Sequence, residues 1–371
     1  MFLIEYVIPF LAVLTVLVFV HEMGHYLVAR WCGVSVEVFS VGFGREIWGR
    51  NDRHGTRWRL SLFPVGGYVK FRGDVGAAST PDVEANRTDT DPGNFHSKSL
   101  GQRAAVVAAG PIANFLLAIA IFWMLFVSFG QPFTTARVSE VVADSPAAEA
   151  GMQPGDLIVS AGGSSIDSFE DLRRVVALNL DSPMEVLIER DGRELSLQVQ
   201  PRVVELTDRF GNTSRVGQLG VRSVEGSWRE LGPVGALTEA VRQTWIVVTS
   251  SLEAIGDMIA GARPLDELRG PAGIAQMSGQ AASVGIASLV SFAAFLSISL
   301  GLINLFPIPM LDGGHLLFYA VEAVRGRPLG AATQELGYKI GLAMVLALMV
   351  LATTNDILHL GVVDFVRNLF S

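Results

Sequence analysis

Four stretches of the sequence are apolar over a length that can cross a membrane. Residues 6–29 comprise 24 mostly apolar positions, which at about 1.5 Å per residue in a helix exceed the ~30 Å of the hydrocarbon layer. Residues 104–129, 286–306 and 336–354 follow the same pattern. The sequence therefore predicts a polytopic α-helical membrane protein with about four transmembrane helices.

Between these stretches, apolar and polar residues alternate as they do in β-strands. Residues 34–72 predict a membrane-associated β-hairpin region, and the polar residues 73–97 predict a loose loop. Short alternating runs in residues 134–203 surround a helical stretch at 169–178, which indicates a small α+β domain. Residues 230–261 have helical spacing of apolar positions interrupted by charges, so we expect an amphipathic helix at the membrane surface.

These elements predict a linear order of segments and an orientation in the membrane. Lys and Arg concentrate in residues 30–103, with eleven, and in the connection after the third span, so both segments are expected to be cytoplasmic. The long region between the second and third spans is expected outside. The predicted segments are 1–30, the first transmembrane helix; 31–103, the cytoplasmic-side β-rich region and loop; 104–130, the second transmembrane helix; 131–205, the α+β domain; 206–282, a linker and amphipathic interfacial helices; 283–315, the third transmembrane helix; and 316–371, the fourth transmembrane helix and tail.

Composition narrows the class of protein. Half of the residues are hydrophobic and 17% are charged, a balance unlike that of an ordinary soluble enzyme or a disordered chain. The net charge of −8 offers no basic surface for nucleic acid, and a lipid bilayer is the expected partner. Cys32 is the one cysteine, so no internal disulfide can form. A cleaved signal peptide is disfavoured because the first stretch lacks a basic n-region and an A-x-A-like cleavage site.

The first apolar stretch contains the motif H-E-x-x-H, as His21-Glu22-Met23-Gly24-His25. On a helix, residues four apart lie on one face, so two imidazoles can share a tetrahedral metal ion while a glutamate exchanges a proton with a nearby water. In the structural alternative, these three groups stabilise one another inside a helical bundle. Charged groups at membrane depth cost roughly 2.5–3.5 kcal/mol each, which favours a functional metal site.

A zinc hydrolase needs a third protein ligand, and residues 304–315 offer candidates. Two prolines and two glycines in this run break a helix at membrane depth, so the segment must be buried in protein or line a wet cavity. Asp312 is predicted to face the metal, and His315 competes with it as the ligand. The structural alternative for Asp312 is a helix cap or turn aspartate at the interface.

Three motifs occur in the first three spans: His21-Glu22-x-x-His25, Gly110-Pro111-x-x-Asn114 and Asn304-x-x-Pro307-x-Pro309-x-Leu311-Asp312-Gly313. Together they resemble those of the site-2 protease family of intramembrane zinc metalloproteases. Residues 145–158 resemble part of a PDZ domain, which points to the bacterial regulator-of-sigma-E-protease branch. Better-known members of that branch have two tandem PDZ domains, whereas this chain has length for one.

The resemblance implies a role for each matching residue. It makes Zn2+ the cofactor, His21, His25 and Asp312 the metal ligands and Glu22 the general base. It also implies that Asn304 and Asn114 hydrogen-bond the substrate backbone. From the residues alone, each asparagine could equally join two helices, a contact worth about 0.6 kcal/mol.

The family also implies a location and a substrate class. We expect a multi-pass protein of the bacterial inner membrane, with its active site toward the cytoplasm and its PDZ-like domain in the periplasm. The expected substrate is a transmembrane segment of a single-pass protein, such as an anti-sigma factor, or a signal-peptide remnant. The PDZ-like domain could bind a C-terminal peptide or restrict access to the membrane site.

A substrate helix must unwind before its peptide bonds can be attacked, and its freed backbone groups then need new partners. Residues 65–71 alternate in polarity and begin near paired glycines, so we expect an edge strand near the metal that adds the substrate as a further strand. Tyr68 and Val69 are the predicted substrate-binding residues of this strand, and an ordinary hairpin is the alternative. A catalytically silent membrane PDZ adaptor with a structural metal site is the competing function.

Overall fold

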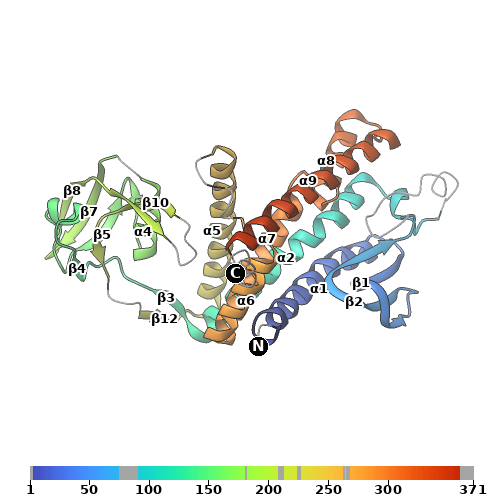
Figure 1. Ribbon diagram of the computed structural model, residues 1–371, viewed down its shortest axis with the longest axis horizontal. Coiled ribbons are helices and arrows are strands. Elements are labelled where there is room, and N and C mark those ends of the chain that lie inside the picture. The colour runs from blue at the N-terminus through green and yellow to red at the C-terminus, as the bar shows by residue number, and fades with distance from the viewer. Residues whose placement is uncertain are drawn as a thin grey trace, which may run out of the picture. The chain divides into compact units, whose positions relative to one another are not determined.

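The chain divides into two compact units, residues 1–125 with 237–371 and residues 126–236 (Figure 1). The structure is a computed structural model that describes residues 3–74, 91–179, 182–207, 213–223, 227–261, 264 and 268–359. The helices outside the second unit are η1 (Leu3–Val7), α1 (Ile8–Trp31), η3 (Phe95–Ser97), α2 (Leu100–Phe129), α5 (Pro233–Ile259), α6 (Pro271–Val284), α7 (Ile286–Leu305), α8 (Asp312–Arg325) and α9 (Ala331–His359).

Four helical segments within the described residues have the length and hydropathy of a membrane span. They are Ile4–Trp31, Leu100–Phe129, Ile286–Leu305 and Ala332–Leu358. Each overlaps one of the four apolar stretches predicted from the sequence, and their number agrees with the predicted polytopic architecture.

Small residues let α1 and α2 approach each other closely. A side chain on Gly24 would collide with the carbonyl oxygen of Ala109 and lie 2.8 Å from Cβ of Ala113. Such glycine contacts are typical of helices that pack in membranes, where close backbone approach supplies the attraction. The motif-bearing face of α1 is therefore held against α2.

A β-sheet packs against α1. Its strands, β1 (Val36–Asn51) and β2 (Arg57–Phe71), are long and bent. Phe39 of β1 pairs with Val69 on one side and with Trp58 on the other, so the first half of β1 lies between two segments of β2. Among the described residues, 67–71 pair with 36–41 alone, which makes this segment an edge strand. The predicted loop 73–97 falls largely outside the described residues, which resume at 91.

The second unit is an α+β structure. A four-stranded antiparallel sheet with the order β6-β5-β7-β8 packs with α4 around a core of residues such as Ile158, Leu172 and Ile188. Its elements are β3 (Gln131–Phe133), β4 (Glu140–Val141), α3 (Pro146–Glu149), β5 (Leu157–Ala161), β6 (Ser164–Ser165), α4 (Phe169–Leu178), β7 (Met184–Arg190), β8 (Arg193–Val199), β9 (Arg202–Thr207), β10 (Thr213–Gln218), β11 (Val221–Arg222) and β12 (Ser227–Arg229).

The second unit extends beyond the boundary at residue 205 that the sequence suggested. It reaches Ala236, because β11 pairs with β4 and β12 pairs with β3 near the start of the unit. Residues 206–229 are therefore not a simple linker. These strands are two to six residues long, too short for alternation of apolar and polar positions to reveal them.

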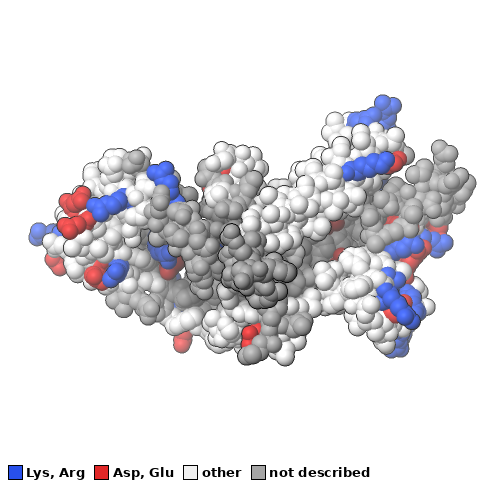
Figure 2. Space-filling model, viewed as in Figure 1, with Lys and Arg blue, Asp and Glu red and all other residues white. Residues whose placement is uncertain are grey.

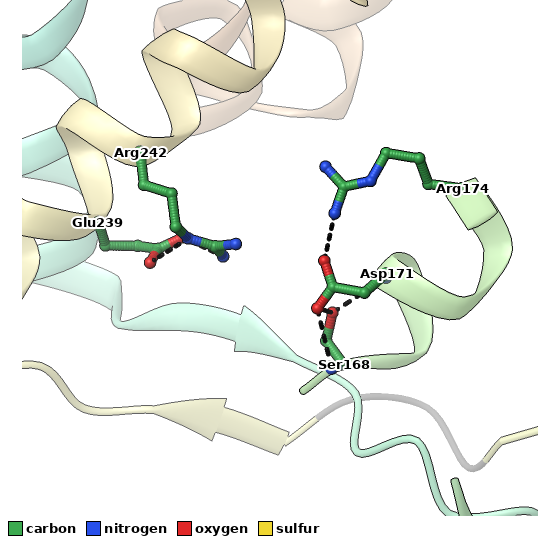
Figure 3. A network of polar contacts seen from close by, with 5 residues as sticks. All are labelled: Ser168, Asp171, Arg174, Glu239 and Arg242. Atoms are coloured by element: carbon green, nitrogen blue, oxygen red, sulfur yellow. Dashed lines mark hydrogen bonds and ion pairs between the residues drawn. The ribbon is translucent and has the colours of Figure 1, made fainter. Parts of the chain in front are cut away.

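Local ion pairs fix the start of α4 and one turn of α5 (Figure 3). Ser168 and Asp171 form a capping box, in which Asp171 N donates to Ser168 Oγ at 3.1 Å and Ser168 N donates to Asp171 Oδ2 at 3.1 Å. Arg174 also pairs with Asp171. On α5, Arg242 donates to Glu239 one turn earlier at 2.6 Å. The predicted helix at 169–178 therefore begins with the cap that its sequence specifies.

Candidate metal centre

Two helices far apart in the sequence bring the candidate ligands together. His21, Glu22 and His25 lie on one turn of α1, while Asp312 is the first residue of α8. The chain between α7 and α8 breaks at residues 306–311, where Met310 has a φ of +91°. This break turns the start of α8 toward α1.

Three potential ligand atoms converge at one point. Nε2 of His21 and Nε2 of His25 are 3.2 Å apart, and they lie 3.2 Å and 3.5 Å from Oδ2 of Asp312. Atoms that share one tetrahedral zinc ion at about 2.0–2.2 Å are separated by about 3.3–3.6 Å. The three separations therefore suit a common ion.

The protonation chemistry of these groups also fits a cation. Nδ1 of His25 donates to the carbonyl oxygen of Val106 at 2.9 Å, so a neutral His25 has a lone pair on Nε2. Both imidazoles are buried, and Oδ2 of Asp312 is a buried oxygen without a hydrogen bond among the described residues. This buried carboxylate oxygen faces two imidazole nitrogens and has no hydrogen-bond donor in the part of the chain that the structure describes. A divalent ion bound between the three atoms would provide the missing positive partner.

Asn114 of α2 lies behind His21 and not at the cavity surface. Its side chain is fully buried, and its Nδ2 is 3.2 Å from Nδ1 of His21, while its Oδ1 is buried without a hydrogen-bond partner. The two ends of an amide have nearly the same shape, and exchanging its oxygen and nitrogen would satisfy both groups. Nδ1–H of His21 would then donate to Oδ1, and Nε2 would carry the lone pair that a metal needs.

Gly110 provides the space in which the two imidazoles pack. The motif Gly110-Pro111-x-x-Asn114 did not predict this role. A side-chain carbon at this position would collide with Nε2 of His25 and lie 2.9 Å from Cε1 of His21. Any larger residue would displace the two rings. Its signal in the sequence was a glycine in the middle of an apolar helix, where glycine costs about 1 kcal/mol relative to alanine.

A cavity of about 190 Å³ opens beside the converging ligands. Among the predicted substrate-binding residues, Asn304, Tyr68 and Val69 line it, and Asn114 does not. Its lining consists of His21, Glu22, His25, Gly67, Tyr68, Val69, Phe71, Val107, Asn304, Met310, Leu311, Asp312 and His315. The edge strand and the ligand-bearing helices therefore share one cavity.

Glu22 and His315 also line the cavity, but neither belongs to the group of three converging ligand atoms. Glu22 packs against the edge strand, since a side-chain carbon on Gly67 would lie 3.4 Å from Cγ of Glu22, and it lines the cavity together with Val69 and the ligands. His315 lines the cavity, but within the described residues the group of mutually close ligand atoms contains His21, His25 and Asp312 without it. Asp312 is thus the better of the two candidates for the third ligand.

Two imidazoles, one carboxylate and a neighbouring glutamate on apolar helices define a class, the metallohydrolases that keep one coordination position open for water. The sequence model of peptidase family M50 matches residues 9–348. The chain belongs to this family, the site-2 protease family of zinc metalloproteases that its motifs predicted.

Proteins of several bacteria are similar over nearly the whole chain. A protein of Agrobacterium fabrum named as a candidate zinc metalloprotease is 49% identical over 363 residues, covering 96% of both chains. Metalloprotease MmpA of Caulobacter vibrioides is 40% identical over 390 residues, covering 98% of both. The similarity therefore includes both compact units.

Solved PDZ domains are similar to smaller parts of the chain. The PDZ domain of HtrA3 bound to a phage-derived ligand is 26% identical, covers 20% of this chain and 84% of its own, and has a TM-score of 0.18. The PDZ domain of an SdrC-like protein from Listeria innocua is 17% identical, covers 26% and 99%, and has a TM-score of 0.21.

Proposed function

We propose that this metalloprotease hydrolyses a peptide bond inside the transmembrane segment of a single-pass membrane protein. The observation that carries the proposal is the shared cavity, in which Glu22 lies between three converging ligand atoms and the free edge of β2. His21, Glu22 and His25 lie on α1, within the segment Ile4–Trp31 that has the length and hydropathy of a membrane span. The test is cleavage of a reconstituted single-pass substrate by wild-type and Glu22→Gln protein, together with zinc analysis of both.

The residues divide the chemistry among them. His21, His25 and Asp312 would hold the zinc ion, which when bound polarises a carbonyl group and lowers the pKa of water toward about 7. Glu22 takes the proton of the attacking water and delivers it to the leaving amine. Because Glu22 lies outside the group of ligand atoms, it is free to move this proton.

The edge strand of β2 positions the substrate. An unwound segment lying beside residues 67–71 would pair its backbone with the free edge, as a peptide does in β-strand addition. Val69 and Glu22 line the same cavity, so a carbonyl group bound at this edge would lie beside the general base. Asn304 lines the same cavity and would hydrogen-bond the substrate backbone.

The membrane arrangement follows from charge. The ends of α1 and α2 that flank the β1–β2 sheet belong to the Lys- and Arg-rich region, so this side and the metal centre would face the cytoplasm. Residues 126–236 would then lie in the periplasm of the bacterial inner membrane, where a PDZ-like domain could bind a C-terminal peptide or restrict access. An anti-sigma factor or a signal-peptide remnant are substrates of the required single-pass kind.

Asn114 is assigned to the orientation of His21 instead of substrate binding. Replacing Asn114 by alanine should weaken zinc binding about tenfold, because residues that orient a metal-binding histidine typically contribute 10–100-fold to affinity. Zinc affinity is measured by competition with a chromogenic chelator, which does not depend on proteolysis.

The variant Asn114→Asp tests whether the amide oxygen or the amide nitrogen of Asn114 faces Nδ1 of His21. A carboxylate can accept the proton of Nδ1 of His21 but cannot donate to it, so zinc affinity should stay near that of the wild type if Asn114 acts as an acceptor. Weaker zinc binding in Asn114→Asp than in Asn114→Ala would show instead that the amide nitrogen faces His21, and would remove this assignment.

A further inference from the structure

A pocket that is separate from the metal centre lies at the turn between β1 and β2. It has a volume of about 400 Å³. Its lining consists of Trp48, Arg50, Asn51, Asp52, Arg53 and Trp58. Trp48 is 60% exposed, so one aromatic wall of the pocket is open to the surroundings.

Asp52 holds the turn in one conformation. Its carboxylate accepts hydrogen bonds from Trp58 Nε1 at 3.0 Å, from Tyr26 Oη at 3.1 Å, and from the backbone N–H groups of His54 and Thr56 at 2.8 Å and 2.9 Å. Although burial acts to raise the pKa of Asp52, these donors lower it to about 2. The carboxylate is therefore an ionised group with its oxygens already engaged, and it serves to build the pocket.

Two arginines leave the pocket with a net positive charge. Arg50 and Arg53 are exposed and form no ion pair with any residue that the structure describes. Arg57 on the neighbouring strand differs, because it pairs with Glu46 at 2.5 Å. Figure 2 shows Lys and Arg side chains gathered over the β1–β2 sheet. An anionic ligand is the natural complement of two guanidinium groups that have no ion pair among the described residues and line one pocket with two indole rings.

The depth of the turn identifies the source of that anion. Tyr26, which bonds to Asp52, lies five residues before the end of the segment Ile4–Trp31, or about 7.5 Å along a helix that is about 42 Å long. A helix of this length projects about 6 Å beyond each face of a ~30 Å hydrocarbon layer, so Tyr26 lies near one face. The turn is therefore at the level of the lipid headgroups.

Exposed apolar side chains elsewhere on the sheet agree with this depth. They extend along β1 and β2 from the pocket to the far end of the sheet, where contact with hydrocarbon would cover them. They are Phe43, Ile47, Leu60, Leu62 and Phe63, with exposed fractions of 42–62%. Leu60 pairs with Trp48 beside the pocket, and Phe43 pairs with Phe63 farther from the turn, so tryptophan lies between the polar turn and the apolar end, as at a membrane interface.

We propose that this pocket binds the headgroup phosphate of an anionic phospholipid such as phosphatidylglycerol. Arg50 and Arg53 contact the phosphate, and Trp48 packs on the glycerol and the upper acyl chain. Because β2 continues from this turn to the edge strand at 67–71, the bound lipid fixes the depth of the sheet beside the metal centre. This inference rests on the proposed membrane location of α1.

The test compares lipid binding by full-length variants. Native mass spectrometry of detergent-purified protein is recorded with phosphatidylglycerol, phosphatidylethanolamine or inorganic phosphate. The pocket variant is Arg50→Gln/Arg53→Gln. The matched control, Arg45→Gln/Arg193→Gln, removes the same charge from two exposed arginines outside the pocket.

Wild type and control should each retain a phosphatidylglycerol molecule that the pocket variant binds about 30-fold more weakly, the factor expected for two interfacial arginines. Phosphatidylethanolamine has an ammonium group that offsets the charge of its phosphate, so it should bind the wild type more weakly than phosphatidylglycerol does and lose less affinity in the pocket variant. Equal binding of phosphatidylglycerol by pocket variant and control would overturn the proposal, and so would displacement of the lipid by millimolar inorganic phosphate.

The same preparations separate this proposal from the proposed function. Zinc content and substrate cleavage are measured for each variant, and insertion of the wild type is measured in vesicles of phosphatidylcholine. A wild type that fails to insert contradicts the membrane location and both proposals. A protein that inserts, holds zinc and cleaves, but shows no difference between pocket variant and control, contradicts the lipid site alone.

Discussion

Replacing Glu22 by glutamine should lower the rate of substrate cleavage about 1000-fold while zinc content stays at the wild-type level. General acid–base groups contribute about 10²–10⁴-fold, and glutamine keeps the shape of the side chain without accepting a proton. The proposed zinc ligands are unaffected, because the group of converging atoms comes from His21, His25 and Asp312. Cleavage of a single-pass substrate in proteoliposomes and elemental analysis for zinc check the two halves of this expectation.

Glu37→Gln is the matched control for this substitution. Glu37 lies on β1, where it pairs with Lys70 at the surface at 2.8 Å, so its loss changes the net charge equally without touching the cavity. Undiminished cleavage by Glu22→Gln would refute the role of Glu22 as general base. Loss of cleavage accompanied by an unchanged cellular function would instead favour the adaptor with a structural metal site.

The convergence of the candidate ligands could be predicted from the sequence. One part of it, the shared position of the two histidines, follows from helix geometry alone. His21 and His25 must share a face once the segment is helical, whatever the rest of the chain does. Asp312 was accessible for a different reason, since a proline- and glycine-rich break at membrane depth needs a protein or water environment. In the structure, one potential ligand atom from each of His21, His25 and Asp312 lies within 4.8 Å of the other two.

The position of Asn114 could not be inferred in the same way. An asparagine in an apolar helix can face substrate or a neighbouring helix, and the sequence contains no measure of the rotation of α2 about its axis. That rotation is set by the contacts of Gly24 and Gly110 with the facing helix. This rotation turns Asn114 toward His21 and away from the cavity. The orientation of the asparagine is therefore determined by tertiary packing and not by the spacing of residues in the sequence.

The length of the second unit was underestimated for a topological reason. Its two terminal pairings, β3 with β12 and β4 with β11, join residues 80 to 98 positions apart. Pairings of such separation leave no local pattern in the sequence. In contrast, the helix at 169–178 carries its own start signal in Ser168 and Asp171, and its bounds agree with the prediction.

Placing proline at Val69 should reduce cleavage of a helical single-pass substrate about 100-fold without loss of zinc. Val69 lies on the edge strand and lines the cavity, so proline removes a backbone donor from this edge while the register with β1 is kept. A buried backbone group left unpaired costs about 1–3 kcal/mol, which at its upper limit corresponds to this factor. Because substrate alignment is lost, KM should rise as kcat falls, whereas Glu22→Gln should lower kcat alone.

Val69→Ala is the control that separates the backbone from the side chain. It removes two methyl groups that are buried beside Phe39 but keeps the N–H, so cleavage should stay within a few-fold of the wild type while thermal stability decreases. If proline and alanine at this position lower cleavage equally, the contribution of residue 69 is packing. The edge of β2 would then not be the surface on which an unwound substrate is aligned.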